Sequence, residues 1–248
     1  MEPLITSLKD RDRNVRLLAA WVLGEIKDRD AIGGLTAALK DEDALVRAGA
    51  ARALGKISDP RVVELLIATL KDPDRRVRCQ VADSMGVIKD SRSVDPLIAA
   101  ALRDPAYDVR ASAAKALAEI KARHAVDGLI AALRDGHPRV VRYAARALAG
   151  FQDSSAAAAL TAAWEDADLR VIAGAASFFI GRSIPHPEPT LIRALNAHGD
   201  NQTLLDFLHS WNPALEKAAR EWATAHRIIL IGVKKASRES AAEQDALL

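Results

Sequence analysis

Residues 43–73 read DALVRAGAARALGKISDPRVVELLIATLKDP, and the segments on either side of this stretch repeat its pattern. Each copy contains one valine, or in one case a leucine, that anchors the alignment. The anchors follow one another at intervals of 29 to 32 residues and are Val15, Val46, Val77, Val109, Val140 and Leu169. A period of this length indicates a repeat protein in which each copy forms one supersecondary unit.

The quoted copy predicts two helices joined by a short turn. After the anchor, apolar residues recur at +4, +8 and +11 (Ala50, Leu54 and Ile57), which places them on one face of a helix. The turn SDPR follows, and a second periodic run begins at Val63. At +9 a small residue recurs in five copies, which permits neighbouring backbones to approach closely. These residues are Gly24, Gly55, Gly86, Ala118 and Ala149, and Phe178 interrupts the series in the sixth copy.

A single pair of helices cannot bury both of its faces, so the copies must stack. The sequence therefore predicts an all-α fold, an α-α superhelix of about six two-helix repeats with a C-terminal helical cap. We expect the solenoid to span residues 1–195, with residues 3–10 forming a solitary second helix at its front. The cap is predicted for residues 196–227, and an apolar strip with a polar, mobile tail for residues 228–248.

The repeat resembles those of the HEAT family, specifically the short HEAT-like repeats first named for phycobilisome lyases. The resemblance rests on VRAGAARALGKISDPRVVELLIATLKD and its relatives, which together cover about residues 3–195. It implies a solenoid whose second helices line the concave side. It leaves the function open, because the same repeat occurs in scaffolds, lyase subunits and accessory domains of enzymes.

Charged residues recur beside the anchor. An arginine follows the anchor directly in five copies, at Arg16, Arg47, Arg78, Arg110 and Arg170. An aspartate stands three residues before it in four copies, at Asp12, Asp43, Asp74 and Asp166. Such an aspartate can accept hydrogen bonds from first-turn amides, and the arginine four residues later can reach that carboxylate or one in the neighbouring unit. We therefore expect a structural ladder between repeats, with a phosphate-binding arginine stripe as the alternative.

The fifth copy favours the ladder over the phosphate-binding stripe. There His137 stands in place of the aspartate and Val141 in place of the arginine, so both members change together. The fourth copy keeps Arg110 but has Ala106 at the aspartate position, so its arginine needs another carboxylate.

Two charged rows are predicted on the second helices. A basic residue follows the last core leucine at Lys40, Lys71, Arg103 and Arg134. An acidic residue follows the core valine at Glu64, Asp95 and Asp127. Because the resemblance places second helices on the concave side, these seven residues form the predicted partner-binding groove. The alternative is an ordinary solvated face, with basic residues near helix C-termini favoured by the helix dipole.

The repeat pattern decays after about residue 182. Three prolines in SIPHPEPTLIRALNAHGD predict the end of one helix and the start of another near residues 187–190. Asn212 and Pro213 predict the start of the last helix. This region resembles the closing segment of some bacterial HEAT-repeat proteins, in which glycine is usual at the position of Trp211. The segment IILIGV at residues 228–233 either packs on the cap or docks onto another chain.

The sequence gives no indication of catalysis. A single cysteine, Cys79, excludes an internal disulfide and a cysteine-rich metal site, and we expect it to be inert. The six histidines form no HExxH or comparable spacing. No His-Glu dipeptide occurs, which disfavours the HEAT-repeat hydroxylase that acts on modified lysine. No metal site and no cofactor are predicted.

The predicted function is a non-catalytic scaffold or adaptor that binds another protein along its concave face. One alternative is a bilin lyase or isomerase subunit, with bilin as its ligand. A less favoured one is a nucleic-acid-binding solenoid, which the formal charge of +2 supports little. The N-terminus lacks a signal-peptide pattern and IILIGV is too short to span a membrane, so we expect a cytoplasmic protein. The sequence does not indicate the partner's identity or the oligomeric state.

Overall fold

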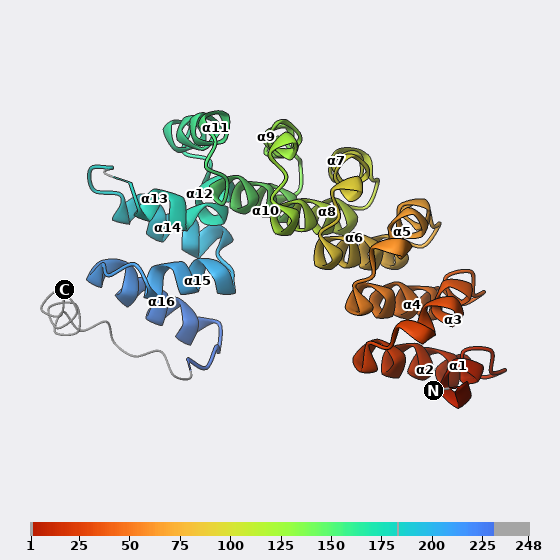
Figure 1. Cartoon of the computed structure of the whole chain (residues 1–248). Coiled ribbons are helices and arrows are strands. Elements are labelled where there is room, and N and C mark those ends of the chain that lie inside the picture. Colours follow the sequence, from red (N-terminus) through yellow and green to blue (C-terminus); the bar gives the residue numbers. More distant parts are fainter. Residues whose placement is uncertain (1, 183, 231–248) are drawn as a thin grey trace, which may run out of the picture. The chain divides into compact units, whose positions relative to one another are not determined.

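The computed structural model describes residues 2–182 and 184–230 of the chain. This part consists of α-helices and short 3-10 helices joined by loops (Figure 1). It forms two compact units, Met1–Thr161 and Ala162–Leu248, and the boundary falls within α11 (Ser154–Glu165). The predicted all-α repeat fold is confirmed. The domain boundaries at residues 195 and 227 remain predictions.

Each of the first four repeats contains a long first helix, a 3-10 turn and a shorter second helix, whereas in the fifth repeat two helices of 12 residues follow one another without such a turn. The first helices are α2 (Arg13–Ile26), α4 (Ala44–Ile57), α6 (Arg75–Ile88), α8 (Tyr107–Ile120) and α10 (Pro138–Ala149). The turns are η1 (Arg29–Ala31), η2 (Pro60–Val62), η3 (Ser91–Ser93) and η4 (Arg123–Ala125). The second helices are α3 (Ile32–Ala38), α5 (Val63–Thr69), α7 (Val94–Arg103), α9 (Val126–Ala132) and α11. In front of them, α1 (Glu2–Ser7) is the solitary helix that the sequence predicts.

The ends of the first helices explain why α3, α5, α7 and α9 are shorter than the first helices before them. Each of α2, α4, α6 and α8 ends at a residue with φ between 55° and 58°, and none of these four residues is glycine (Lys27, Ser58, Lys89 and Lys121). This left-handed residue stops the helix and redirects the chain. In three of these four repeats an aspartate then caps the 3-10 turn, as Asp59 does by accepting from the amide of Arg61. The turn takes up the residues that would otherwise form the first turn of the second helix.

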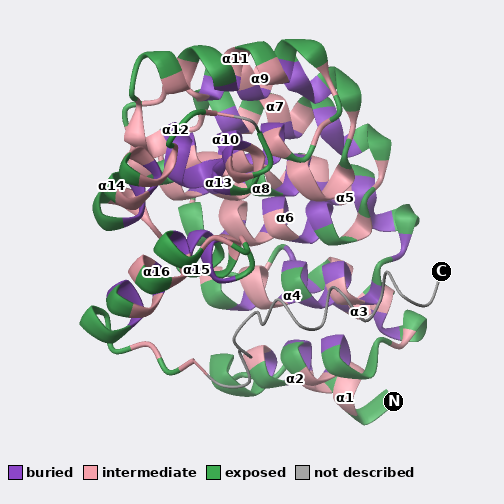
Figure 2. Ribbon diagram, turned by 90° about the vertical axis from the view of Figure 1, so that its left-hand side faces the viewer, coloured by how far each residue is buried: buried purple, intermediate pink, exposed green. Residues whose placement is uncertain are grey.

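Small residues bring successive first helices into close contact. A Cβ atom on Gly24 would lie 2.8 Å from the Cα of Ala53, and one on Gly55 would lie 2.6 Å from the Cβ of Ser84. The same helices are joined by a hydrogen bond of 2.9 Å from the Ser84 hydroxyl to the carbonyl of Ala51. The small residues predicted at +9 therefore face the next first helix. Figure 2 shows the resulting stack of α2, α4, α6 and α8.

This close approach sets the curvature of unit 1. First helices pack directly against one another along the whole row, whereas contacts between successive second helices are sparser. The closely spaced row must form the inner side of a curved stack. In Figure 1 the first helices accordingly follow the inner edge of the arc of unit 1, and α3, α5, α7 and α9 follow its outer edge. The expectation that the second helices line the concave side is therefore wrong for this unit.

Unit 2 departs from the regular repeat. The first helix of the sixth copy is divided into α12 (Leu169–Gly174) and α13 (Ala176–Ile180) at Ala175, whose backbone has φ −108° and ψ 28°. Three further helices follow, namely α14 (Glu188–His198), α15 (Asn201–Leu208) and α16 (Pro213–Ala225). α14 packs on α12 and on α16, around a core that includes Phe179 and Phe207.

The last helix begins as the sequence predicts. Asn212 caps α16 by accepting from the amides of Ala214 and Leu215. Before it, Trp211 has φ 55°, which explains why glycine suits this position. Of the segment IILIGV, Ile228 donates its amide to the carbonyl of Ala223, and Ile229 is exposed. Residues 231–233 of that segment and the predicted tail lie outside the described residues.

Candidate functional site

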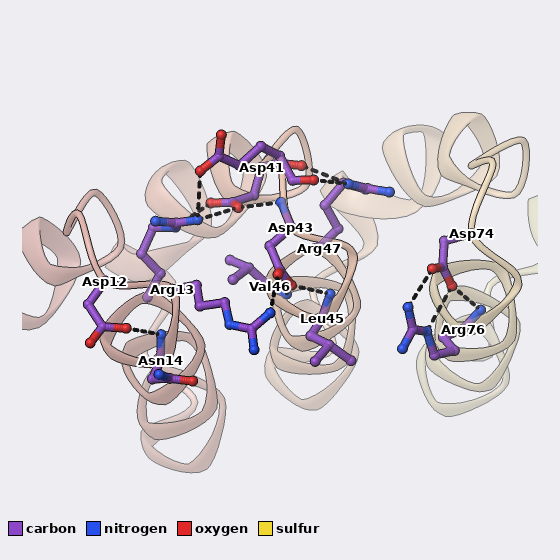
Figure 3. A network of polar contacts seen from close by, with 12 residues as sticks. Asp12, Arg13, Asn14, Asp41, Asp43, Leu45, Val46, Arg47, Asp74 and Arg76 are labelled. Carbon is purple, nitrogen blue, oxygen red and sulfur yellow. Dashed lines mark hydrogen bonds and ion pairs between the residues drawn. The ribbon is translucent and has the colours of Figure 1, made fainter.

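The repeated arginine joins the loops on either side of its own repeat. Arg47 donates through Nε and Nη2 to both oxygens of Asp72, at 2.8 and 3.0 Å. Its Nη1 donates to the backbone carbonyls of Asp41 and Glu42, at 2.8 and 3.1 Å. The side chains of Arg47 and Asp72 are only 13% and 8% exposed. One guanidinium thus connects the loop before its repeat with the loop after it, and Figure 3 shows its side toward the loop of Asp41.

The same arrangement occurs four times in succession. The bidentate pairs are Arg16–Asp41, Arg47–Asp72, Arg78–Asp104 and Arg110–Asp135, with distances of 2.7 to 3.1 Å. Every one of these carboxylates also accepts the amide two residues later, as Asp72 accepts that of Asp74 at 2.8 Å. The hydrogen bond from Arg78 to Asp104 raises the pKa of the guanidinium. We call these eight residues the arginine ladder.

The carboxylates of the arginine ladder are not the ones that the sequence analysis named. Asp12, Asp43 and Asp74 instead cap the first helices, and Asp43 accepts the amides of Leu45 and Val46. Their own arginine partners are local or exposed, with Arg13 on Asp43 and Arg76 on Asp74 (Figure 3). The capping geometry directs each of these carboxylates at the first turn of its helix. The buried arginine of a repeat instead binds the aspartate that stands two residues before the cap of the next repeat, as Arg47 binds Asp72.

The arginine ladder ends before the fifth copy, whose sequence lacks the arginine, and the pair predicted for the sixth copy does not form. Val141 is buried where the earlier copies have arginine, and His137 caps α10 by accepting the amide of Arg139. In the sixth copy Arg170 binds Asp168, at 2.7 Å, and this aspartate caps α12. The predicted pair of Asp166 with Arg170 is therefore replaced by a local one.

The predicted partner-binding rows lie on the outer side of unit 1. All seven residues are exposed, and their helices follow the outer edge of the arc (Figure 1). They are Lys40, Lys71, Arg103, Arg134, Glu64, Asp95 and Asp127. Part of the acidic row contacts basic groups of the next repeat, since Glu64 lies 3.3 Å from Arg92 and Asp95 lies 3.7 Å from His124. These residues remain a predicted docking surface, on the convex rather than the concave side.

A different set of side chains lies on the side of the first helices that points away from the second helices. Positions +6 and +10 after each anchor occupy this side because helix periodicity places them opposite the core positions. We call it the inner surface and define it by Trp21, Glu25, Arg52, Lys56, Asp83, Val87, Lys115, Glu119 and Arg146. Its charges pair between neighbouring repeats, with Lys56 bound to Glu25 and Lys115 placed 3.4 Å from Asp83.

The inner surface contains a small apolar pocket between α2 and α4. The pocket has a volume of about 80 Å³, and its apolar walls are Leu17, Trp21, Gly24, Gly49 and Ala53. Trp21 is 50% exposed. The sequence analysis missed this site because it followed positions that recur, whereas the residue at +6 changes between neighbouring copies.

No catalytic or metal centre is found among the described residues. Burial raises the pKa of the Cys79 thiol to about 11, which opposes thiolate formation. The adjacent Arg78 binds Asp104 and does not activate it. In the described part of the chain, no group of three or more histidine, cysteine or acidic residues could hold a metal ion. Within the same residues, no helix is long and apolar enough to cross a membrane.

Stacked two-helix repeats tied by a buried arginine ladder define an α-solenoid. The family model for HEAT repeats matches residues 1–86, 34–118 and 94–178. The chain therefore belongs to the HEAT-repeat family. This agrees with the resemblance noted in the sequence.

Two solved structures show the same architecture. The chain is 26% identical to one from the complex of CpcE and CpcF of phycocyanin lyase from Nostoc, with a TM-score of 0.56 over 90% of this chain and 93% of that chain. It is 23% identical to YibA of Escherichia coli, with a TM-score of 0.57 over 89% of this chain and 80% of that chain. The second likeness shows the fold alone. No curated protein sequence matches this chain.

Proposed function

We propose that this protein is a scaffold or adaptor that binds another protein on the inner surface of unit 1. The observation that carries the proposal is that the recurring charged residues are used within the protein, whereas the variable ones lie on its surface. The recurring arginines are buried and bound to carboxylates, so they hold the solenoid together. The variable residues at +6 and +10 are exposed or half-buried instead, and differences between repeats at these positions can specify a partner.

The arrangement of the arginine ladder also argues against the nucleic-acid alternative. Each ladder guanidinium uses its donors on an aspartate and on backbone carbonyls, as Arg78 does on Asp104, Asp72 and Pro73. These groups are not available to phosphate oxygens. The protein should therefore show no salt-sensitive retention on DNA or RNA that depends on the ladder arginines.

The proposal is tested by affinity capture with two variants of opposite design. In the inner variant, Arg52→Glu and Lys115→Glu reverse two charges of the inner surface. In the outer variant, Lys71→Glu, Arg103→Glu and Arg134→Glu reverse the predicted basic row. We expect the inner variant to lose the partner that the unchanged protein captures and the outer variant to keep it. The opposite result would assign binding to the second helices and refute the proposal.

A second candidate function is a subunit of a bilin lyase or isomerase. The similarity to the phycocyanin lyase complex of CpcE and CpcF favours it, since the aligned regions cover nine-tenths or more of both chains. In this case the partner of the inner surface would be another lyase subunit, and the complex would act on a bilin. Mixing the protein with a CpcF-type subunit and bilin tests this candidate, because it requires a coloured complex. A colourless mixture without complex formation would exclude it.

A further inference from the structure

The pocket between α2 and α4 differs from the rest of the inner surface in both shape and charge. We propose that it binds one aliphatic side chain of an acidic segment of the partner protein, and that Arg52 binds a carboxylate beside it. This inference rests on the proposed function, because it names the kind of partner that the inner surface takes.

The shape of the pocket follows from missing side chains. Gly24 lies so close to Ala53 that a Cβ atom would be 2.8 Å from the neighbouring Cα, so the two helices touch at this point. Gly49 allows Leu17 to approach closely, because a Cβ at position 49 would lie 2.8 Å from the Leu17 Cδ1, and both residues line the pocket. The half-exposed ring of Trp21 forms the remaining wall. A volume of about 80 Å³ accommodates an aliphatic side chain, given that a cavity of roughly 150 Å³ takes up benzene.

The sequence places this combination at one junction of unit 1. At +3, where α4 has Gly49, the following first helices carry Gln80, Ser112 and Tyr143. At +6, where α2 has Trp21, the following first helices carry Arg52, Asp83, Lys115 and Arg146. A glycine floor beside an aromatic wall therefore occurs at the junction of the first and second repeats, and other junctions offer larger or charged side chains.

The charges at the rim select an acidic partner. Lys56 lines the pocket and binds Glu25, and this hydrogen bond lowers the pKa of the Glu25 carboxyl. Arg52 also lines the pocket and is exposed, and it has no hydrogen bond or ion pair among residues 2–182 and 184–230. Its charge helps to lower the pKa of Glu25, but the guanidinium makes no hydrogen bond to that carboxylate and can bind one from a partner in a bidentate pair. A basic segment would be repelled by the same group.

The occupant is therefore an acidic segment that carries an aliphatic residue. The side chain supplies the apolar contact with Trp21, and a neighbouring carboxylate supplies the contact with Arg52. Either contact alone is weak, because a single exposed ion pair contributes little and the pocket is small. Together the two contacts select the order of residues in the segment, because the aliphatic side chain and the carboxylate must be separated by the distance between Trp21 and Arg52.

The test uses a blocked nine-residue peptide with a central leucine and four glutamates on each side. Two control peptides of the same length are used. In the alanine twin the leucine is replaced by alanine, and in the lysine twin every glutamate is replaced by lysine. Binding is followed in the nitrogen-15 correlation spectrum of the whole chain, at the indole N–H signal that disappears in Trp21→Phe. We expect the leucine peptide to shift this signal saturably, the alanine twin to bind roughly tenfold more weakly, and the lysine twin not to shift it.

Two protein variants complete the test. Arg52→Glu should weaken the leucine peptide by about fivefold or more, whereas Lys115→Glu, at the same position two repeats later, should change its affinity less than about twofold. Equal binding of the leucine and alanine peptides, or an equal effect of the two variants, would overturn the inference. So would the absence of a shift at the Trp21 signal.

The failure of this inference and that of the proposed function can be told apart. A captured protein partner that needs the inner surface, yet binds Trp21→Ala with unchanged affinity, would refute the pocket and leave the proposed function standing. Conversely, if the peptide shifts Trp21 while the captured partner depends on the outer variant alone, the pocket stands and the proposed function fails.

Discussion

Replacing Arg47 by alanine tests the arginine ladder at a position where the guanidinium joins the loops on both sides of its repeat. The change removes four hydrogen bonds, two to Asp72 and two to the carbonyls of Asp41 and Glu42. It leaves the Asp72 side chain, 8% exposed, with the amide of Asp74 as its remaining donor. Breaking a buried pair by removing one partner costs about 3–5 kcal/mol. Because water can reach this loop once the guanidinium is gone, we expect a loss near the lower limit, about 3 kcal/mol.

The loss is measured as the free energy of unfolding in urea, followed by circular dichroism at 222 nm and by tryptophan fluorescence. If the two signals give the same unfolding curve, the repeats unfold together, and a two-state free energy of unfolding can be calculated. Arg52→Ala is the matched control, since it removes an exposed arginine from the same helix and should change stability by less than about 0.5 kcal/mol. The Arg47→Ala and Asp72→Ala changes combined should cost less than the sum of the single changes.

Salt distinguishes a buried ladder from a surface network. Because Arg47 and Asp72 are nearly inaccessible, raising the sodium chloride concentration to about 0.5 M should leave the loss unchanged. A loss in Arg47→Ala no larger than that in Arg52→Ala would refute the reasoning, because it would mean that solvent already satisfies both groups.

Four further changes test other parts of the fold. Ser93→Ala should stabilise the protein by about 1 kcal/mol, because its buried hydroxyl has no partner among the described residues, whereas Ser84→Ala should destabilise it by about 1 kcal/mol through loss of an interhelical hydrogen bond, both measured in urea. Ser58→Gly should stabilise by about 0.5–1 kcal/mol in the same assay, because residue 58 has φ 55°. The hydrogen bond from Arg76 lowers the pKa of Asp74 to about 2, so the contribution of this carboxylate is complete above pH 4 and is lost as the pH falls towards 2. Asp74→Asn should therefore flatten the dependence of stability on pH between 4 and 2, and an unchanged curve would contradict that assignment.

The repeat register and the helices could be predicted because local signals agree with the fold. The spacing of the anchors placed every first helix of unit 1, and the same register marked the small residues between them. The α-helical C-terminal region was also predictable at Asn212, because its side chain and the following proline act locally. The left-handed residues at Lys27 and Ser58 were not predictable, since neither is a residue type that usually signals that conformation.

The aspartate partners of the arginine ladder could have been predicted from the sequence, but only by comparing each arginine with the repeat that follows it. The true carboxylates stand five residues before the next anchor, at Asp41, Asp72, Asp104 and Asp135. At the following junction Val141 replaces the arginine and Trp164 occupies the corresponding position, where it packs on Phe179 at 4.9 Å. The members that change together are therefore Val141 and Trp164, not Val141 and His137. The contact joins adjacent repeats, so alignment within one repeat could not reveal it.

The concave side was predicted wrongly because the direction of curvature depends on packing distances. First helices pack closely on one another through glycine and alanine, whereas successive second helices contact one another less, so the stack bends towards the first helices. The family resemblance assigned the opposite side by the order of helices in the repeat. A comparison of side-chain size in the two rows would have given the correct direction.

The most direct measurement of the central claim is site-specific photo-cross-linking in the presence of the partner. A benzophenone side chain is placed singly at Trp21, Arg52 or Lys115 on the inner surface, and at Lys71 or Arg103 on the outer helices. The account predicts cross-links to one partner from the inner positions and none from the outer ones. Cross-links from the outer positions with none from the inner positions would contradict it.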